Sequence, residues 1–61
     1  MDLRTYLWNE NIKPARMAYE IGVAPATIYH WMNGKSKPNV SHCQAIEKYT
    51  NKKVLMKDFY G

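Results

Sequence analysis

The stretch "PARMAYEIGVAPATIYHWMN", residues 14–33, decides the fold. Pro14 and Pro25 each suit the first turn of a helix, and Gly22 suits the left-handed position that follows a helix end. Apolar residues recur at helical spacing on both sides of this glycine. Two short helices joined by a turn that contains glycine are the helix-turn-helix pattern. We predict these two helices over residues 14–21 and 25–33.

The residues between the two predicted helices suit close packing. Ala18 is small enough to let the helices approach, and Val23 can fill the space at the turn. Ile28 and Trp31 lie three positions apart, so they share one face of the second helix and anchor it against the first.

The opposite face of this second helix is polar and lacks acidic residues. At about 100° per residue, this outward face lies away from Ile28. It carries Ala26, His30 and Asn33, with Thr27 and Tyr29 on its flanks. We therefore interpret the Tyr29-His30-Trp31 run as two surface residues beside one core residue, and not as an active site.

Two further helices are predicted over residues 2–10 and 40–50, with Asp2 and Asn39 as N-caps. The tail is ambiguous, because Val54–Met56 suits an extended piece and Asp58–Tyr60 suits a single helical turn. We expect it to cover the core with Val54, Leu55 or Phe59. The prediction is an all-α fold: a compact bundle of four main helices with a short C-terminal tail, one domain over residues 1–61.

Composition narrows the class of protein. A chain of 61 residues has room for one small domain and no deep cleft, so we expect no enzyme, small-molecule substrate or cofactor. No apolar run approaches the roughly 20 residues of a membrane span. The single cysteine, Cys43, suits a reducing cytosol, and its spacing from His30 and His42 matches no zinc pattern. The net charge of +4 favours an anionic partner.

The charges are arranged around the predicted second helix of the pair. No Asp or Glu occurs between Ile21 and Ile46. Basic side chains stand at the start of the first helix of the pair and in the loop after the second, where groups that flank a DNA groove meet phosphates. These basic residues are Lys13, Arg16, Lys35 and Lys37. The amide of Arg16, near a helix N-terminus, is expected to favour phosphate as well.

With these residues in view, the chain resembles the Cro and repressor group of phage helix-turn-helix proteins, and within it the small Cro-like and YdaS-type proteins. The resemblance rests on Ala18, Gly22, Ile28, Trp31 and the run "IYHWMNGKSKP". It extends to the start "LRTYLWNENI", the "W-x-x-G-K" segment and "IEKYTN", so it covers nearly the whole chain. The resemblance implies a lambda-repressor-like bundle that binds operator DNA in the major groove, usually as a dimer.

The chain departs from this family where the recognition helix begins. Ala24 replaces the usual Ser or Thr cap, and Pro25 and Ala26 replace the usual Gln or Ser that reach bases. Recognition of DNA bases therefore shifts to the middle of the helix, and Ala26 offers only a methyl contact with thymine. The expected base contacts are Ala26, Thr27, Tyr29 and His30, and the expected phosphate contacts are Lys13, Arg16, Asn33, Lys35 and Lys37.

We therefore expect a cytoplasmic transcriptional repressor of Cro type, from a phage or prophage, in the bacterial cytosol or nucleoid. Its partner would be double-stranded operator DNA, bound by a homodimer that forms at least on DNA through Val54–Gly61 or the fourth helix. Two alternatives stay open: an antitoxin-like autoregulator of a toxin gene, and a helical protein-interaction module with no DNA role.

Overall fold

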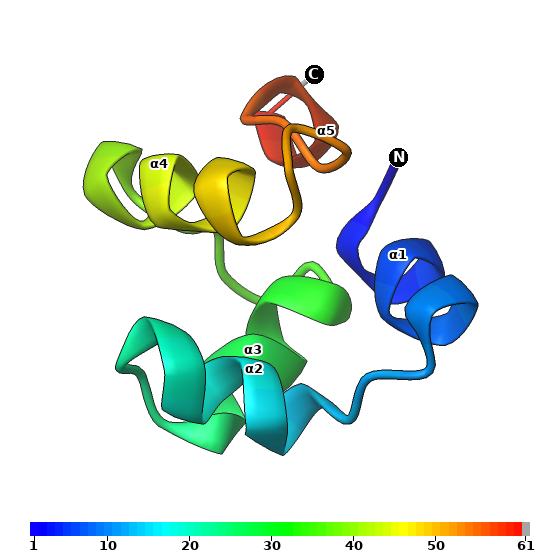
Figure 1. The fold of residues 1–61 in the computed structure, drawn as a ribbon. Helices are drawn as coiled ribbons and strands as arrows, with labels where there is room; N and C mark the ends of the chain where they lie inside the picture. Colours follow the sequence, from blue (N-terminus) through cyan, green and yellow to red (C-terminus); the bar gives the residue numbers. More distant parts are fainter. Residues whose placement is uncertain (61) are drawn as a thin grey trace.

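The computed structural model describes residues 1–60, and within them it contains helices and no strand (Figure 1). Four helices of eight to ten residues and one short helix are present. Their bounds are α1 Leu3–Glu10, α2 Pro14–Ile21, α3 Pro25–Met32, α4 Val40–Tyr49 and α5 Lys57–Tyr60. The predicted all-α fold with four main helices is confirmed. None of the described helices is long and apolar enough to cross a bilayer.

The helices start in two different ways. At α1 the Asp2 carboxylate accepts a hydrogen bond from the Thr5 amide at 2.7 Å, and at α4 the Asn39 side chain accepts one from the His42 amide at 2.8 Å. The bond from Thr5 holds the pKa of Asp2 below its usual value. At α2 and α3 a proline occupies the first turn and no side chain caps the helix. A proline at the first helical position has no amide hydrogen, so one fewer of the unpaired donors at the helix start needs a partner.

Two glycines end helices in the left-handed conformation. Gly22 has φ +82° after α2, and Gly34 has φ +74° after α3, with Asn33 between Gly34 and the helix. A side chain with a Cβ adopts this conformation at a cost, so glycine is the favoured residue at both positions. The left-handed conformation predicted for Gly22 is confirmed.

The core lies where α1, α2, α3 and α4 converge. Ile28 and Met17 are completely buried and Trp31 nearly so, which confirms the inner face predicted for α3. The imidazole of His42 on α4 lies beside the Trp31 ring and is tilted against it by 50°, with 5.3 Å between ring centroids. The buried cluster comprises Leu3, Tyr6, Leu7, Met17, Ala18, Ile28, Trp31, Ile46 and Val54.

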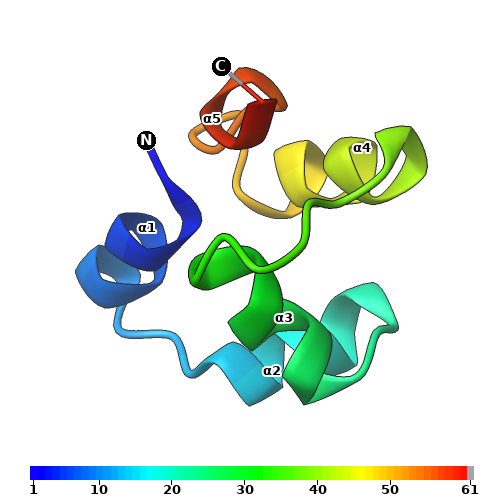
Figure 2. The ribbon, with the colours of Figure 1, turned by 180° about the vertical axis from the view of Figure 1, so that it is seen from behind.

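The tail after α4 returns to the start of the chain, and α5 and the N-terminus lie on the same side of the molecule in both views (Figures 1 and 2). Val54 is completely buried and Phe59 packs against the core, which confirms that the tail covers it. The single turn expected in the tail is α5. Gly61, the last residue of the predicted dimer surface, lies outside the described residues.

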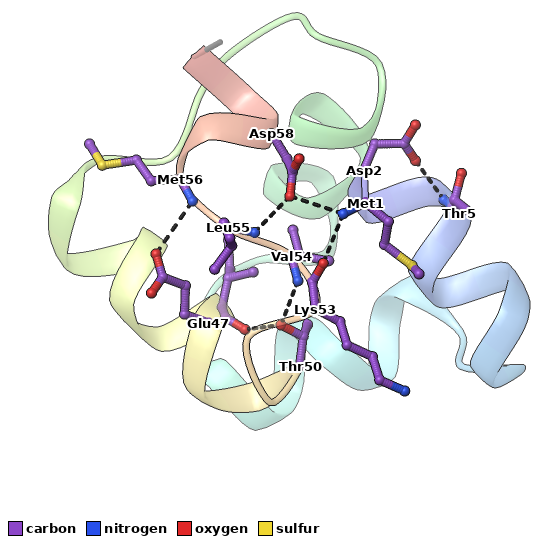
Figure 3. A network of polar contacts seen from close by, with 11 residues as sticks. Met1, Asp2, Thr5, Glu47, Thr50, Lys53, Val54, Leu55, Met56 and Asp58 are labelled. Atoms are coloured by element: carbon purple, nitrogen blue, oxygen red, sulfur yellow. Dashed lines mark hydrogen bonds and ion pairs between the residues drawn. The ribbon is translucent and has the colours of Figure 1, made fainter.

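A polar network shapes this tail (Figure 3). The Thr50 hydroxyl donates to the Ile46 carbonyl at 2.8 Å and accepts from the Val54 amide at 3.1 Å. The Asp58 carboxylate accepts from the Leu55 amide at 2.8 Å and from the amino group of Met1 at 3.1 Å. Side chains therefore satisfy the amides of Val54 and Leu55, which no regular helix or sheet pairs here.

Candidate nucleic-acid interface

The turn between α2 and α3 is tightly closed. The amides of Gly22 and Val23 both donate to the Ala18 carbonyl, each at 2.9 Å. Ala18 is completely buried, and Val23 is half-buried against the core. The small side chain and the left-handed glycine bring α2 and α3 into the most extensive contact between helices of the fold. The fold thus contains the helix-turn-helix geometry predicted for residues 14–33.

The outer face of α3 is open to solvent. Ala26, Tyr29 and His30 are exposed, with 48% of Tyr29 accessible. Thr27 is half-buried, so less of its side chain is available than of the other three residues. Three of the four expected base contacts therefore share an accessible face, with Thr27 at its edge.

The expected phosphate contacts at Lys13, Lys35 and Lys37 are also exposed. Lys13 is the N-cap residue of α2, and the two other lysines lie in the loop that follows α3. Lys37 holds its ammonium 5.2 Å from the centroid of the Tyr60 ring, an arrangement typical of a cation–π contact. The cations therefore stand at the beginning of the helix-turn-helix and just beyond its end.

Arg16 has a different environment from the one predicted. Its guanidinium pairs with the Glu20 carboxylate one turn along α2 at 3.1 Å, and Glu20 also accepts from the Tyr49 hydroxyl at 3.2 Å. Burial, with Glu20 adding to it, raises the pKa of Tyr49, so this hydroxyl keeps its proton. The Arg16 amide, expected to favour phosphate, donates to the Lys13 carbonyl at 2.9 Å.

Arg4 is a residue that the sequence prediction missed. Its guanidinium donates to the Asn33 side-chain oxygen at 2.6 Å, which ties α1 to the end of α3. Asn33 therefore has its oxygen engaged, while its amide nitrogen remains the group suited to donate to a phosphate. The two residues are 29 positions apart, and no local pattern signals such a contact.

Comparison with known proteins agrees with this geometry. The helix-turn-helix family model matches residues 9–55, which is more than half of the chain and includes α2, α3 and α4. No curated protein and no solved structure matches the chain significantly. The match supports a DNA-binding regulator of transcription whose partner is double-stranded DNA. The chain belongs to the lambda-repressor/Cro-like family of helix-turn-helix proteins.

Proposed function

We propose that the protein is a sequence-specific repressor of the Cro type, of the kind that phages and prophages encode, acting in the bacterial cytosol. In this proposal α3 enters the major groove of an operator, and bound protein blocks polymerase. The observation that carries it is the exposed outer face of α3, with Ala26, Tyr29 and His30 accessible and lysines at both ends of the motif. A major groove admits one helix and presents base edges to such a face.

We further propose that two copies bind together on the operator, with recognition helices about 34 Å apart in successive major grooves. Exposed apolar side chains on α4 and the tail support a contact between copies there. Val40 is 57% exposed, and Met56 and Tyr60 are also accessible. Burial of such side chains against a second copy removes apolar surface from water.

Selection of bound duplexes from a random pool tests both proposals. A repressor of this kind enriches one motif, and a dimer enriches an inverted repeat with half-sites one helical turn apart. Recovery of a single half-site would show that one copy binds alone. If the protein retains no duplex even at low salt, the proposal fails in favour of a protein-interaction module.

Variants on the enriched duplex then separate base contacts from phosphate contacts. Tyr29→Ala and His30→Ala are each expected to cost about 1–3 kcal/mol and to relax base preference. Lys35→Ala is expected to weaken all duplexes alike and to lower the salt slope by about one unit. The measurement is fluorescence anisotropy on specific and random duplexes over a series of salt concentrations. Equal losses on both duplexes for all three variants would mean that another face reads the DNA.

A further inference from the structure

A second surface of the molecule borders the recognition helix without belonging to it. A groove of about 340 Å³ lies between α1, the start of α2 and the last turn of α3. Its floor includes Leu7, Ile12 and Met32, and its exposed rim includes Arg4, Trp8 and Lys13. We call this surface the α1 groove.

The rim of the α1 groove is positively charged. Arg4 and Lys13 contribute cations from two different elements, and no carboxylate is among the described residues that line the groove. Glu10, the acidic residue nearest to it along α1, pairs with Lys53 at 3.6 Å. The groove therefore favours an anionic occupant, and charge repulsion disfavours a cationic one.

The Trp8 side chain adds a second requirement on the chemistry of a molecule that occupies the α1 groove. Its indole is 84% exposed, although Trp is among the residues that proteins most often bury in contacts. It shares one face of α1 with Arg4, four positions earlier. An indole offers a flat apolar surface and one N–H donor, so an occupant with apolar C–H faces and anionic oxygens satisfies the whole rim. A sugar–phosphate backbone has both.

The α1 groove is also continuous with the face proposed to bind DNA. Met32 in its floor belongs to the last turn of α3, and Lys13 on its rim is one of the expected phosphate contacts. The hydrogen bond from Arg4 to Asn33 fixes the guanidinium at the end of the recognition helix. We therefore expect a duplex with α3 in its groove to place its flanking backbone beside these residues.

We propose that the α1 groove binds the sugar–phosphate backbone of the same DNA duplex that α3 reads. Arg4 and Lys13 contact phosphates, and the Trp8 indole packs against deoxyribose. This inference rests on the proposed DNA-binding function and adds a contact from α1 to it. The contact is independent of base sequence, because the groove offers no paired donors and acceptors that match a base edge.

The test compares Arg4→Gln with Lys52→Gln, a matched loss of one exposed cation in the turn that follows α4. Binding of the full chain to a specific and a random duplex is measured by anisotropy from about 50 to 200 mM salt. We expect Arg4→Gln to weaken both duplexes several-fold and to lower the salt slope by about one unit. Lys52→Gln is expected to leave the slope unchanged. Arg4→Lys keeps the charge and is expected to restore the slope, and thermal unfolding shows which variants are folded.

Quenching of tryptophan fluorescence by acrylamide gives a second readout. Trp31 is buried, so the quencher reports on Trp8. We expect added duplex to protect Trp8 from the quencher. If the wild-type protein binds DNA while Trp8 stays fully quenchable and Arg4→Gln keeps the wild-type slope, the inference is overturned and DNA binding stands. Protection that grows with protein concentration alone places a second copy in the groove and also overturns it. No duplex binding at all refutes the proposed function itself.

Discussion

The helix-turn-helix and the C-terminal tail cover the same core by different means. In the former, apolar side chains such as Ile28 pack at helical spacing, and Gly22 makes the turn. In the tail, Thr50 and Asp58 satisfy backbone groups through their side chains, and Val54 is the apolar side chain that is completely buried among the described residues that follow α4. The comparison indicates that packing holds the motif that binds DNA, whereas hydrogen bonds position the segment that closes the bundle.

The largest loss of folding stability is expected in the packed core of the helix-turn-helix. Ile28→Ala removes a completely buried side chain between α3 and the core, and such a change costs about 2–5 kcal/mol. A small domain has little stability beyond this, so we expect the variant to be largely unfolded at 37 °C. Urea denaturation followed by circular dichroism measures the loss. Val40→Ala is the control, since Val40 is exposed and its loss is expected to cost under about 0.5 kcal/mol.

A smaller loss of folding stability is expected when the polar network of the tail is broken. Thr50→Val keeps the shape of the side chain but removes the hydroxyl between Ile46 and Val54. The Val54 amide then loses its acceptor, at a cost of about 1–3 kcal/mol. Thr50→Ser keeps the hydroxyl and is expected to retain most of the stability.

Amide hydrogen exchange locates this effect. Exchange at Val54 is expected to speed up more in Thr50→Val than exchange in α2 or α3, because the tail opens before the helix-turn-helix does. Uniform acceleration through the whole chain would contradict the proposed division between the two regions.

The turns of the two regions differ in a way that a pair of variants can sharpen. Gly22 and Lys52 both have left-handed backbones, with φ +82° and +65°. Apart from its two chain neighbours, no residue has a heavy atom within 4 Å of a Cβ placed on Gly22, so Gly22→Ala has a conformational cost alone, of about 1–2 kcal/mol. Lys52→Gly is expected to remove a similar strain from the tail and to stabilise it by up to about 1 kcal/mol.

Thermal unfolding measures both changes, since about 1 kcal/mol shifts the melting temperature of a domain this small by several degrees. Gly22→Ala is expected to lower the melting temperature and Lys52→Gly to raise it. Opposite signs support the view that the sequence suits the backbone at one turn and strains it at the other. A lower melting temperature for both variants would mean that the Lys52 side chain stabilises the tail by other contacts.

Much of the helix-turn-helix could be predicted from the sequence because its causes are local. Gly22, Ala18 and the spacing of Ile28 and Trp31 lie within a few residues of the groups they act on. The tail could not be resolved in the same way. Thr50 follows the last residue of α4 and carries a hydroxyl that usually faces solvent, so nothing nearby indicates that it is buried.

In the candidate interface, too, local features could be predicted from the sequence and contacts between distant residues could not. The exposure of Tyr29 and His30 follows from the period of α3, and the structure agrees with it. The pairing of Arg4 with Asn33 depends on how α1 lies against α3, which only the folded chain defines. Arg16 is an intermediate case: Glu20, four residues later, is the kind of partner that a helix pattern predicts.

The smallest expected change in stability is the one that pH causes through Asp58 in the tail. The hydrogen bond from the Leu55 amide is the main cause that holds the pKa of Asp58 below its usual value of 3.8. A carboxyl whose pKa is lowered on folding stabilises the protein above its unfolded pKa and loses that contribution as the pH falls through the folded pKa. We therefore expect Asp58 to contribute fully near neutral pH and to lose its contribution below about pH 4. The hydrogen bond from the Thr5 amide lowers the pKa of Asp2 as well. The contribution of Asp2 to stability therefore falls over the same pH range, and mutation is needed to separate it from that of Asp58.

Asp58→Asn makes that separation, since the amide has no charge to lose. The variant is expected to be less stable than the wild type at pH 7, because a neutral amide oxygen accepts the Leu55 hydrogen bond more weakly than a carboxylate does. Its free energy of unfolding is expected to fall less steeply between about pH 4 and pH 2 than that of the wild type. Urea titrations at a series of pH values measure both slopes. If the two slopes are equal, Asp58 does not couple the tail to pH, and the network around Thr50 is left as the main polar support of this region.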